Sequence, residues 1–163
     1  MRRANPGDIN AIIELERLAA SAAHWPRQQY ENVFVTTEKQ LRCGRFAWVV
    51  EDDRDGRAKQ AGPGTSQVVA FLVARRVDLE WELENIVVAD TVRRQGAGKL
   101  LLDEFLAFAY AHEGRSVSLE VRESNKVARA LYQKFGFLEA GMRKNYYSNP
   151  GDAAVIYRLT PIK

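Results

Sequence analysis

The chain has 163 residues, of which 46% are hydrophobic and 28% are charged. These values are typical of one soluble globular domain, and they exclude collagen-like, low-complexity and wholly disordered proteins. The formal net charge of +3 is too small to indicate a nucleic-acid-binding tract. Cys43 is the only cysteine, which excludes an internal disulfide or cysteine-based metal site and favours a cytoplasmic location. The sequence also lacks the run of about 18 apolar residues that a membrane span requires.

Residues 1–73 are predicted to form a short strand, two helices and a pair of strands. Asp8 is placed to cap a helix with an apolar face, and Pro26 is placed to begin a second helix that reaches Phe34. Segments 46–50 and 68–73 are rich in β-branched and aromatic residues, so we expect them to pair as strands. The connecting segment 52–67 contains three glycines, one proline and six charged residues. It predicts a long mobile hairpin loop.

The remainder of the chain alternates between strand and helix patterns. Strands are predicted over residues 81–88, 116–121, 137–142 and 153–159. A helix with an apolar face follows the first of these and ends near Gly114, and another begins at Ser124 or Asn125 and ends at Gly136. This order is typical of an α/β protein.

A basic loop with two closely spaced glycines joins the strand over 81–88 to the helix after it. It reads Arg93-Arg94-Gln95-Gly96-Ala97-Gly98-Lys99. Backbone N–H groups at such a helix start bind phosphate, and glycine permits close approach. A P-loop would need glycine at 93 and serine or threonine at 100, where Arg93 and Leu100 stand. A dinucleotide fingerprint would need a small residue at 101, which is Leu101.

The loop and its flanking elements resemble the acyl-coenzyme A pyrophosphate motif of the GNAT superfamily of N-acetyltransferases. Further runs across residues 80–157 resemble the bacterial ribosomal-protein-alanine N-acetyltransferases (RimI type) within it. Those runs are Glu80-Trp81-Glu82-Leu83-Glu84-Asn85-Ile86-Val87-Val88, Leu119-Glu120-Val121-Arg122-Glu123-Ser124-Asn125, Ala130-Leu131-Tyr132 and Arg143-Lys144-Asn145-Tyr146-Tyr147. The resemblance implies a single N-acetyltransferase domain over residues 1–163. Its expected fold is α/β, a GNAT-like mixed and twisted β-sheet of about six to seven strands flanked by about four helices.

The resemblance implies acetyl-CoA as the acetyl donor, bound without a metal. The main chain of Ile86, Val87 and Val88 is expected to pair with the pantetheine arm as an added strand would. The pyrophosphate is expected on the loop, and one side chain beyond it is expected to contact coenzyme A. These residues are Arg94, Gln95, Gly96, Ala97, Gly98, Lys99 and, in the second group, Asn125.

Glu120 and Tyr132 match the proton acceptor and the general acid of the family. In a strand, Ser118 and Glu120 face opposite to their neighbours, so Glu120 can point into a cleft. A surface glutamate is the alternative. For Tyr132 the alternative is a core aromatic, but Val127, Leu131 and Phe135 already form a packing stripe at four-residue spacing.

The acceptor implied by the resemblance is a protein N-terminus, first of all that of a ribosomal protein with N-terminal alanine. Making an α-amine neutral at pH 7 costs about 1.4 kcal/mol, whereas a lysine costs about 4.6 kcal/mol. Glu80 and Glu82 could attract a cationic acceptor, and Tyr146 and Tyr147 could line its channel; a charged surface stripe and simple packing are the alternatives. Trp81 stands where small residues are usual and could narrow the channel.

Three other functions remain open from the sequence. One keeps the fold but acetylates a small amine, an antibiotic or a lysine side chain. Another is a non-catalytic acyl-CoA sensor, against which the presence of both Glu120 and Tyr132 weighs. RNA or ribosome binding through the basic loop receives little support because no base-stacking motif accompanies it. No direct nucleic-acid partner, membrane partner or metal is expected, and the oligomeric state is left open.

Overall fold

The computed structural model describes residues 1–19, 22–35, 43–52 and 67–162. Within these ranges one seven-stranded sheet has the order β1-β2-β3-β4-β5-β7-β6. The strands are β1 (Arg2–Arg3), β2 (Cys43–Asp52), β3 (Gln67–Val77), β4 (Glu80–Val88), β5 (Ser116–Arg122), β6 (Leu138–Ser148) and β7 (Gly151–Leu159). The helices are α1 (Ile9–Leu18), α2 (Arg27–Glu31), α3 (Ala97–Ala111) and α4 (Lys126–Lys134). The predicted α/β class and numbers of elements are confirmed.

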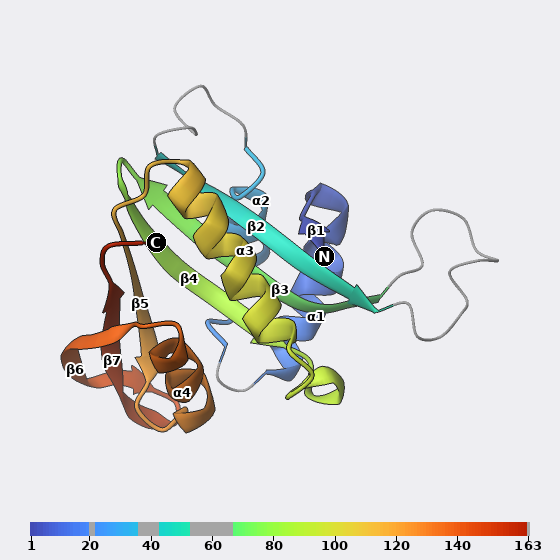
Figure 1. Cartoon of the computed structure of the whole chain (residues 1–163). Helices are drawn as coiled ribbons and strands as arrows, with labels where there is room; N and C mark the ends of the chain where they lie inside the picture. The colour runs from blue at the N-terminus through green and yellow to red at the C-terminus, as the bar shows by residue number, and fades with distance from the viewer. Residues whose placement is uncertain (20–21, 36–42, 53–66, 163) are drawn as a thin grey trace.

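Helices cover both faces of the sheet (Figure 1). On one face, α3 buries Leu101, Leu102 and Phe105 against β2, β3 and β4, and α4 joins the same core through Tyr132. On the other face, α1 and α2 pack against residues such as Phe71 of β3. These are the apolar faces that helical and strand periodicity predict. None of the described helices is long and apolar enough to cross a membrane.

Several boundaries differ from the sequence prediction. The predicted strands over 46–50 and 68–73 belong to the longer β2 and β3, which pair from Cys43↔Val77 to Asp52↔Gln67. The segment predicted as a loop at 52–67 therefore begins and ends in strands, and its residues 53–66 lie outside the described residues. The second helix ends at Glu31 rather than Phe34.

Asp8 stands at the N-cap position of α1, as the sequence predicted, but its side chain makes no capping hydrogen bond to the helix. A 3-10 turn (Pro6–Asp8) precedes the helix, and Asn5 caps that turn by accepting a hydrogen bond from the Gly7 N–H. The Asp8 carboxylate instead accepts hydrogen bonds at 2.8 Å from Arg2 and from the Asn5 N–H. The Arg2 bonds are the main cause that lowers the pKa of Asp8. Asp8 thus holds the N-terminal strand to the first helix.

A buried carboxylate connects α1 to β4. Glu16 is 2% exposed. Its two oxygens accept hydrogen bonds from Asn85 Nδ2 at 2.7 Å and from the Trp25 N–H at 3.0 Å. Burial and the charge of Glu16 raise the pKa of Tyr30, whose hydroxyl lies 3.1 Å from Asn85. These contacts hold Trp25 and Tyr30 to Glu16 of α1 and Asn85 of β4.

Trp81 is a core residue, which corrects the prediction that it borders the acceptor channel. It is 1% exposed, and its ring lies 5.2 Å from that of Phe46 and 5.9 Å from that of Phe105. Alternation on β4 directs Trp81 toward α3, while Glu82 points to the opposite face.

The segment after α3 passes closely over Trp81, and this explains the glycine at 114. A Cβ atom on Gly114 would lie 2.7 Å from both Trp81 Nε1 and the Ala109 carbonyl oxygen. We expect Gly114→Ala to lower the free energy of unfolding by about 1 to 3 kcal/mol, because neither a buried ring nor backbone yields cheaply. Urea unfolding measures this. Gly151→Ala is the control, since no atom lies within 4 Å of its Cβ position, and an equal loss in both variants would contradict the explanation.

Candidate active site

Strands β4 and β5 separate halfway along their length. They pair in parallel only from Glu80↔Ser116 to Leu83↔Leu119. Beyond this point β4 stays paired with β3 as far as Val88, and β5 stays paired with β7 as far as Arg122. The pairing of β3 with β4 skips Glu84, so a β-bulge lies where the separation begins. Beyond Leu83 and Leu119, the facing edges of β4 and β5 therefore do not pair with each other.

The predicted pantetheine-binding residues lie on this open edge. After the bulge, Ile86 and Val88 pack toward α3, whereas Val87 packs toward α1. Their N–H and C=O groups on the β5 side have no partner from β5. Such an edge can accept an extended chain as an additional strand.

The predicted pyrophosphate loop lies at the end of the same edge. Gly96, with φ of 91°, precedes α3 in a left-handed conformation that favours glycine. The first hydrogen bond of the helix runs from the Leu100 N–H to the Gly96 carbonyl at 2.9 Å. The N–H groups before Leu100 therefore have no carbonyl acceptor within the helix. At Gly98 a Cβ would lie 3.4 Å from Leu131 Cδ2 and 3.6 Å from Val88 Cγ2. Gly98 therefore lies where α3, α4 and the end of β4 meet, and a Cβ there would make ordinary van der Waals contacts.

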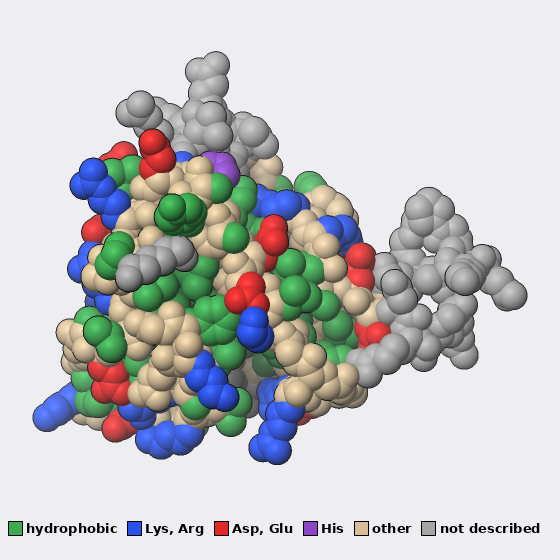
Figure 2. All heavy atoms as spheres, in the orientation of Figure 1, with side chains coloured by type: hydrophobic (Ala, Val, Ile, Leu, Met, Phe, Trp, Pro, Cys, Tyr) green, Lys and Arg blue, Asp and Glu red, His purple; other side chains and the backbone are tan. Residues whose placement is uncertain are grey.

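Basic side chains surround this loop. In the space-filling view, lysine and arginine gather along the lower edge, where Figure 1 shows the loop and α4 (Figure 2). Arg93 pairs with Asp90 at 2.7 Å and Lys99 pairs with Asp103 at 2.5 Å. Arg94 is exposed, and no described acidic residue pairs with it. A positive surface of this kind suits an anionic ligand.

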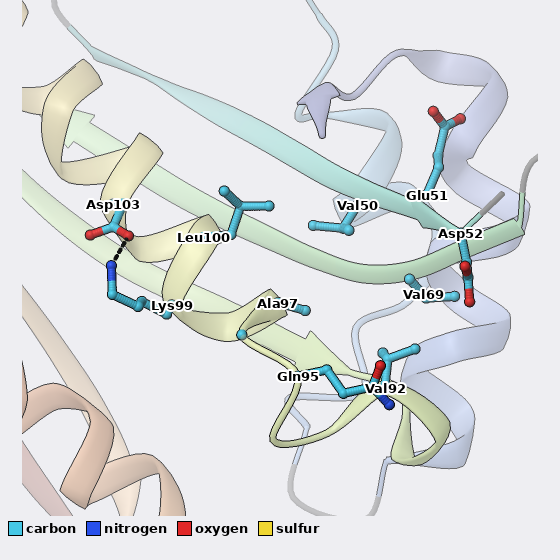
Figure 3. A pocket seen from close by; sticks show the side chains of 11 residues that line it. Val50, Glu51, Asp52, Val69, Val92, Gln95, Ala97, Lys99, Leu100 and Asp103 are labelled. Atoms are coloured by element: carbon cyan, nitrogen blue, oxygen red, sulfur yellow. Dashed lines mark hydrogen bonds and ion pairs between the residues drawn. The ribbon is translucent and has the colours of Figure 1, made fainter. Parts of the chain in front are cut away.

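A hollow of about 430 Å³ lies on the β2 side of the loop. Leu100 of α3 and Val50 of β2 point toward each other across it (Figure 3). Its lining includes Gly96, Ala97 and Lys99 from the loop and the start of α3, and also the carboxylates Glu51, Asp52 and Asp103. Because the carboxylates would repel phosphate, the part of the hollow formed by the N–H groups at the start of α3 is the better anion site.

Glu120 lies one residue beyond the last pair of β4 with β5. Its alternation with the buried Leu119 and Val121 is as predicted, and its side chain is 25% exposed. Arg143 Nε lies 3.0 Å from Glu120 Oε1. The negative charge of Glu120 is the main cause that raises the pKa of Tyr146. The glutamate is thus held in a polar cluster beside the open strand edge.

The two adjacent tyrosines come from an irregular part of β6. Pairing with β7 runs from Arg143↔Ala154 to Tyr147↔Asp152, so β6 carries two additional residues there. Burial first, and then the charge of Glu120, raise the pKa of Tyr147. The guanidinium carbon of Arg122 lies 4.1 Å from the centre of the Tyr147 ring. The structure therefore brings the predicted tyrosines to the predicted base.

Tyr132 is the buried residue of α4, 4% exposed, with Phe137 at 5.9 Å between ring centres. The predicted packing stripe is wrong at Val127, which is 72% exposed. Burial is the main cause that raises the pKa of Tyr132 well above its ordinary value, with a further contribution from Tyr147. Tyr147 thus interacts electrostatically with both Glu120 and Tyr132.

Three other predicted residues have partners within the protein. Asn125 caps α4 by accepting a hydrogen bond from the Ala128 N–H at 3.1 Å, and its contact with coenzyme A stays a prediction. Glu80 pairs with Arg158 at 2.7 Å, and Glu82 pairs with Arg75 at 2.6 Å. Since arginines neutralise both carboxylates, attraction of a cationic acceptor by them is weakened. Within the described ranges, no group of three or more His, Cys, Asp or Glu residues could hold a metal ion.

Arg143 lies in the candidate site beside Glu120, although the sequence alone did not predict a role for it. The run Arg143-Lys144-Asn145-Tyr146-Tyr147 resembles the family, but an ion pair between β6 and β5 leaves no periodic pattern in the sequence. A basic residue two or three positions before the paired tyrosines was the available signal.

Comparison with known proteins gives a consistent result. Residues 9–137 match the model of the acetyltransferase (GNAT) family. The ribosomal protein bS18-alanine N-acetyltransferase of Haemophilus influenzae is 44% identical over 86 residues, which are 52% of this chain and 58% of that protein. That of Escherichia coli K12 is 40% identical over 97 residues, 59% of this chain and 66% of that protein. The match thus spans 58% to 66% of the length of these two relatives.

Solved structures match over nearly the whole chain. The ribosomal-protein-S18-alanine N-acetyltransferase from Escherichia coli has a TM-score of 0.73 at 27% identity, covering 99% of this chain and 92% of that one. Arabidopsis thaliana NAA60 in complex with acetyl-CoA has a TM-score of 0.77 at 18% identity, covering 98% of this chain and 96% of that one. The second likeness shows a shared fold alone.

Proposed function

Because the chain belongs to the GNAT family of acetyltransferases, we propose that it moves the acetyl group of acetyl-CoA to the N-terminal α-amine of a protein. A ribosomal protein with N-terminal alanine is the first candidate acceptor, since the matched relatives are named for that reaction. Such a substrate would place the reaction in the cytoplasm. The observation that carries the proposal is the separation of β4 from β5 beside Glu120.

The open strand edge supports a donor site. Pantetheine amides would pair with Ile86–Val88 of β4, and the pyrophosphate would lie on the N–H groups at the start of α3. This arrangement directs the thioester into the opening between β4 and β5. An N–H of β4 would then donate to the thioester carbonyl oxygen, where negative charge develops.

Glu120 would act as the base. Its carboxylate is 25% exposed, which leaves a path for the acceptor and for proton exchange with water. The amine nitrogen forms a bond to the thioester carbon, and the carbon–sulfur bond breaks. The acceptor ammonium loses two protons, which Glu120 passes to solvent.

Tyr132, which matches the general acid of the family, would donate a hydrogen bond to the leaving sulfur. Its raised pKa keeps the phenol protonated in the resting protein, so it is a reliable hydrogen-bond donor. A thiolate is the weaker base, with a pKa of about 8.5. Tyr132 would therefore stabilise the growing negative charge by donating a hydrogen bond, and the released thiolate would take its proton from solvent.

A thiol-release assay tests the proposed function. The substrates are a peptide with N-terminal alanine and one internal lysine, the same peptide with a blocked N-terminus, and a polyamine. We expect kcat/KM at least tenfold higher for the free peptide than for the blocked peptide, because the α-amine is neutralised more easily than lysine. Turnover of the blocked peptide or polyamine alone would overturn the proposed acceptor. Binding of acetyl-CoA without any turnover would favour a sensor module.

A further inference from the structure

The basic residue that faces the proposed base has unused donors. Arg143 contacts Glu120 through Nε at 3.0 Å, and its side chain is 57% exposed. The ring centre of Tyr146 lies 5.5 Å from the guanidinium carbon, so the side chain is held on two sides. No other ion pair or hydrogen bond joins Arg143 to a described residue. Its two terminal nitrogens therefore keep four N–H donors beside Glu120.

Those donors distinguish between kinds of amine. In a peptide, the carbonyl group of the first residue is separated from the α-amine by a single carbon atom. Because Arg143 Nε lies 3.0 Å from Glu120 Oε1, an α-amine bound at Glu120 would bring this carbonyl oxygen within reach of the guanidinium. A lysine side chain or a polyamine carries only methylene groups there, and a polyamine also brings a second positive charge, which Arg143 would repel.

We propose that Arg143 selects N-terminal α-amines by donating a hydrogen bond to the first peptide carbonyl of the acceptor while Glu120 receives the amine. This inference rests on the proposed function and deepens it to the choice of substrate class. A charge-assisted bond to a group that the competing substrate lacks is an efficient basis for discrimination. The contact with Glu120 also holds the guanidinium in position before the acceptor arrives.

The test compares two acceptors in the same variants. The quantity measured is the ratio of kcat/KM for an alanine-terminated peptide to kcat/KM for a primary alkylamine without a carbonyl group. We expect Arg143→Gln to lower this ratio at least tenfold. Arg143→Lys keeps the positive charge but loses the planar fork, so we expect it to restore less than half of the loss on a logarithmic scale.

Arg158→Gln is the matched control. Arg158 lies on β7, the strand next to β6, and it also pairs with a glutamate, Glu80 of β4, at 2.7 Å. The loss of the Arg158 guanidinium should change the ratio less than twofold. Calorimetric titration with coenzyme A reports whether each variant folds. Equal losses on both acceptors in Arg143→Gln would overturn the inference, because they would indicate a general effect through Glu120. A wild-type protein that fails on the peptide but acetylates the alkylamine would overturn the proposed function as well.

Discussion

Glu120→Gln is expected to lower kcat by about 10² to 10⁴-fold, the usual contribution of a positioned proton acceptor. The amide keeps the shape of the side chain but cannot take a proton from the acceptor. The affinity for acetyl-CoA should change little, because the proposed donor contacts lie on β4 and at the start of α3. Steady-state kinetics with an alanine-terminated peptide, together with calorimetric binding of coenzyme A, measures both effects.

The pH dependence of that variant gives a second readout. Without a base, the reaction depends on the fraction of acceptor that is already neutral, which rises tenfold per pH unit below the α-amine pKa of about 8. We therefore expect the difference from the wild-type protein to shrink as the pH rises. Glu123→Gln changes the same charge three residues along the chain and should keep activity within about twofold. A loss of less than threefold in Glu120→Gln would remove the glutamate from the mechanism.

Periodicity in the sequence was sufficient to predict the sheet and its helices. Buried residues such as Leu101 and Phe105 recur at helical spacing, and Leu119 and Val121 alternate with polar neighbours. The ends of β2 and β3 were missed because charged residues continue those strands. Arg45 and Arg75, for example, form ion pairs with glutamates of β4, which a hydrophobic pattern does not report.

The geometry of the site was harder to predict than its residues. The glycine loop, Glu120 and the paired tyrosines were all identified by resemblance, but their common position depends on the bulge at Glu84 and the irregular register of β6. Both are defined by pairing between strands far apart in the sequence. The environment of Trp81 was misjudged for a similar reason, since the direction of its side chain follows from the packing of α3.

The helix α4 shows how spacing alone misleads. Val127, Leu131 and Phe135 share a helical face, but α4 contacts the core mainly through its later residues, so Val127 is 72% exposed and Tyr132 is buried. Helical spacing places Tyr132 about 100° from Leu131 and so predicts that it lies away from the packing stripe. The structure instead requires any chemical role of Tyr132 to be compatible with burial.

Tyr132→Phe tests whether a buried phenol contributes chemistry as well as packing. The substitution removes the hydroxyl and keeps the ring, whose centre lies 5.9 Å from the centre of the Phe137 ring. We expect kcat to fall about 10² to 10³-fold, since the leaving thiolate loses its hydrogen-bond donor. The melting temperature should remain close to that of the wild-type protein, because the packed volume is nearly unchanged.

The choice of leaving group separates the two roles of this tyrosine further. An acetyl thioester whose thiol has a lower pKa needs less help to depart, so it should recover part of the activity of Tyr132→Phe but not of Glu120→Gln. Tyr110→Phe, on the 62% exposed Tyr110 of α3, is the control for loss of a phenol. Full activity in Tyr132→Phe would leave Tyr132 a core residue only. An acetylated protein intermediate detected by mass spectrometry would contradict direct transfer, because Glu120 and Tyr132 act on protons and neither carries the acetyl group.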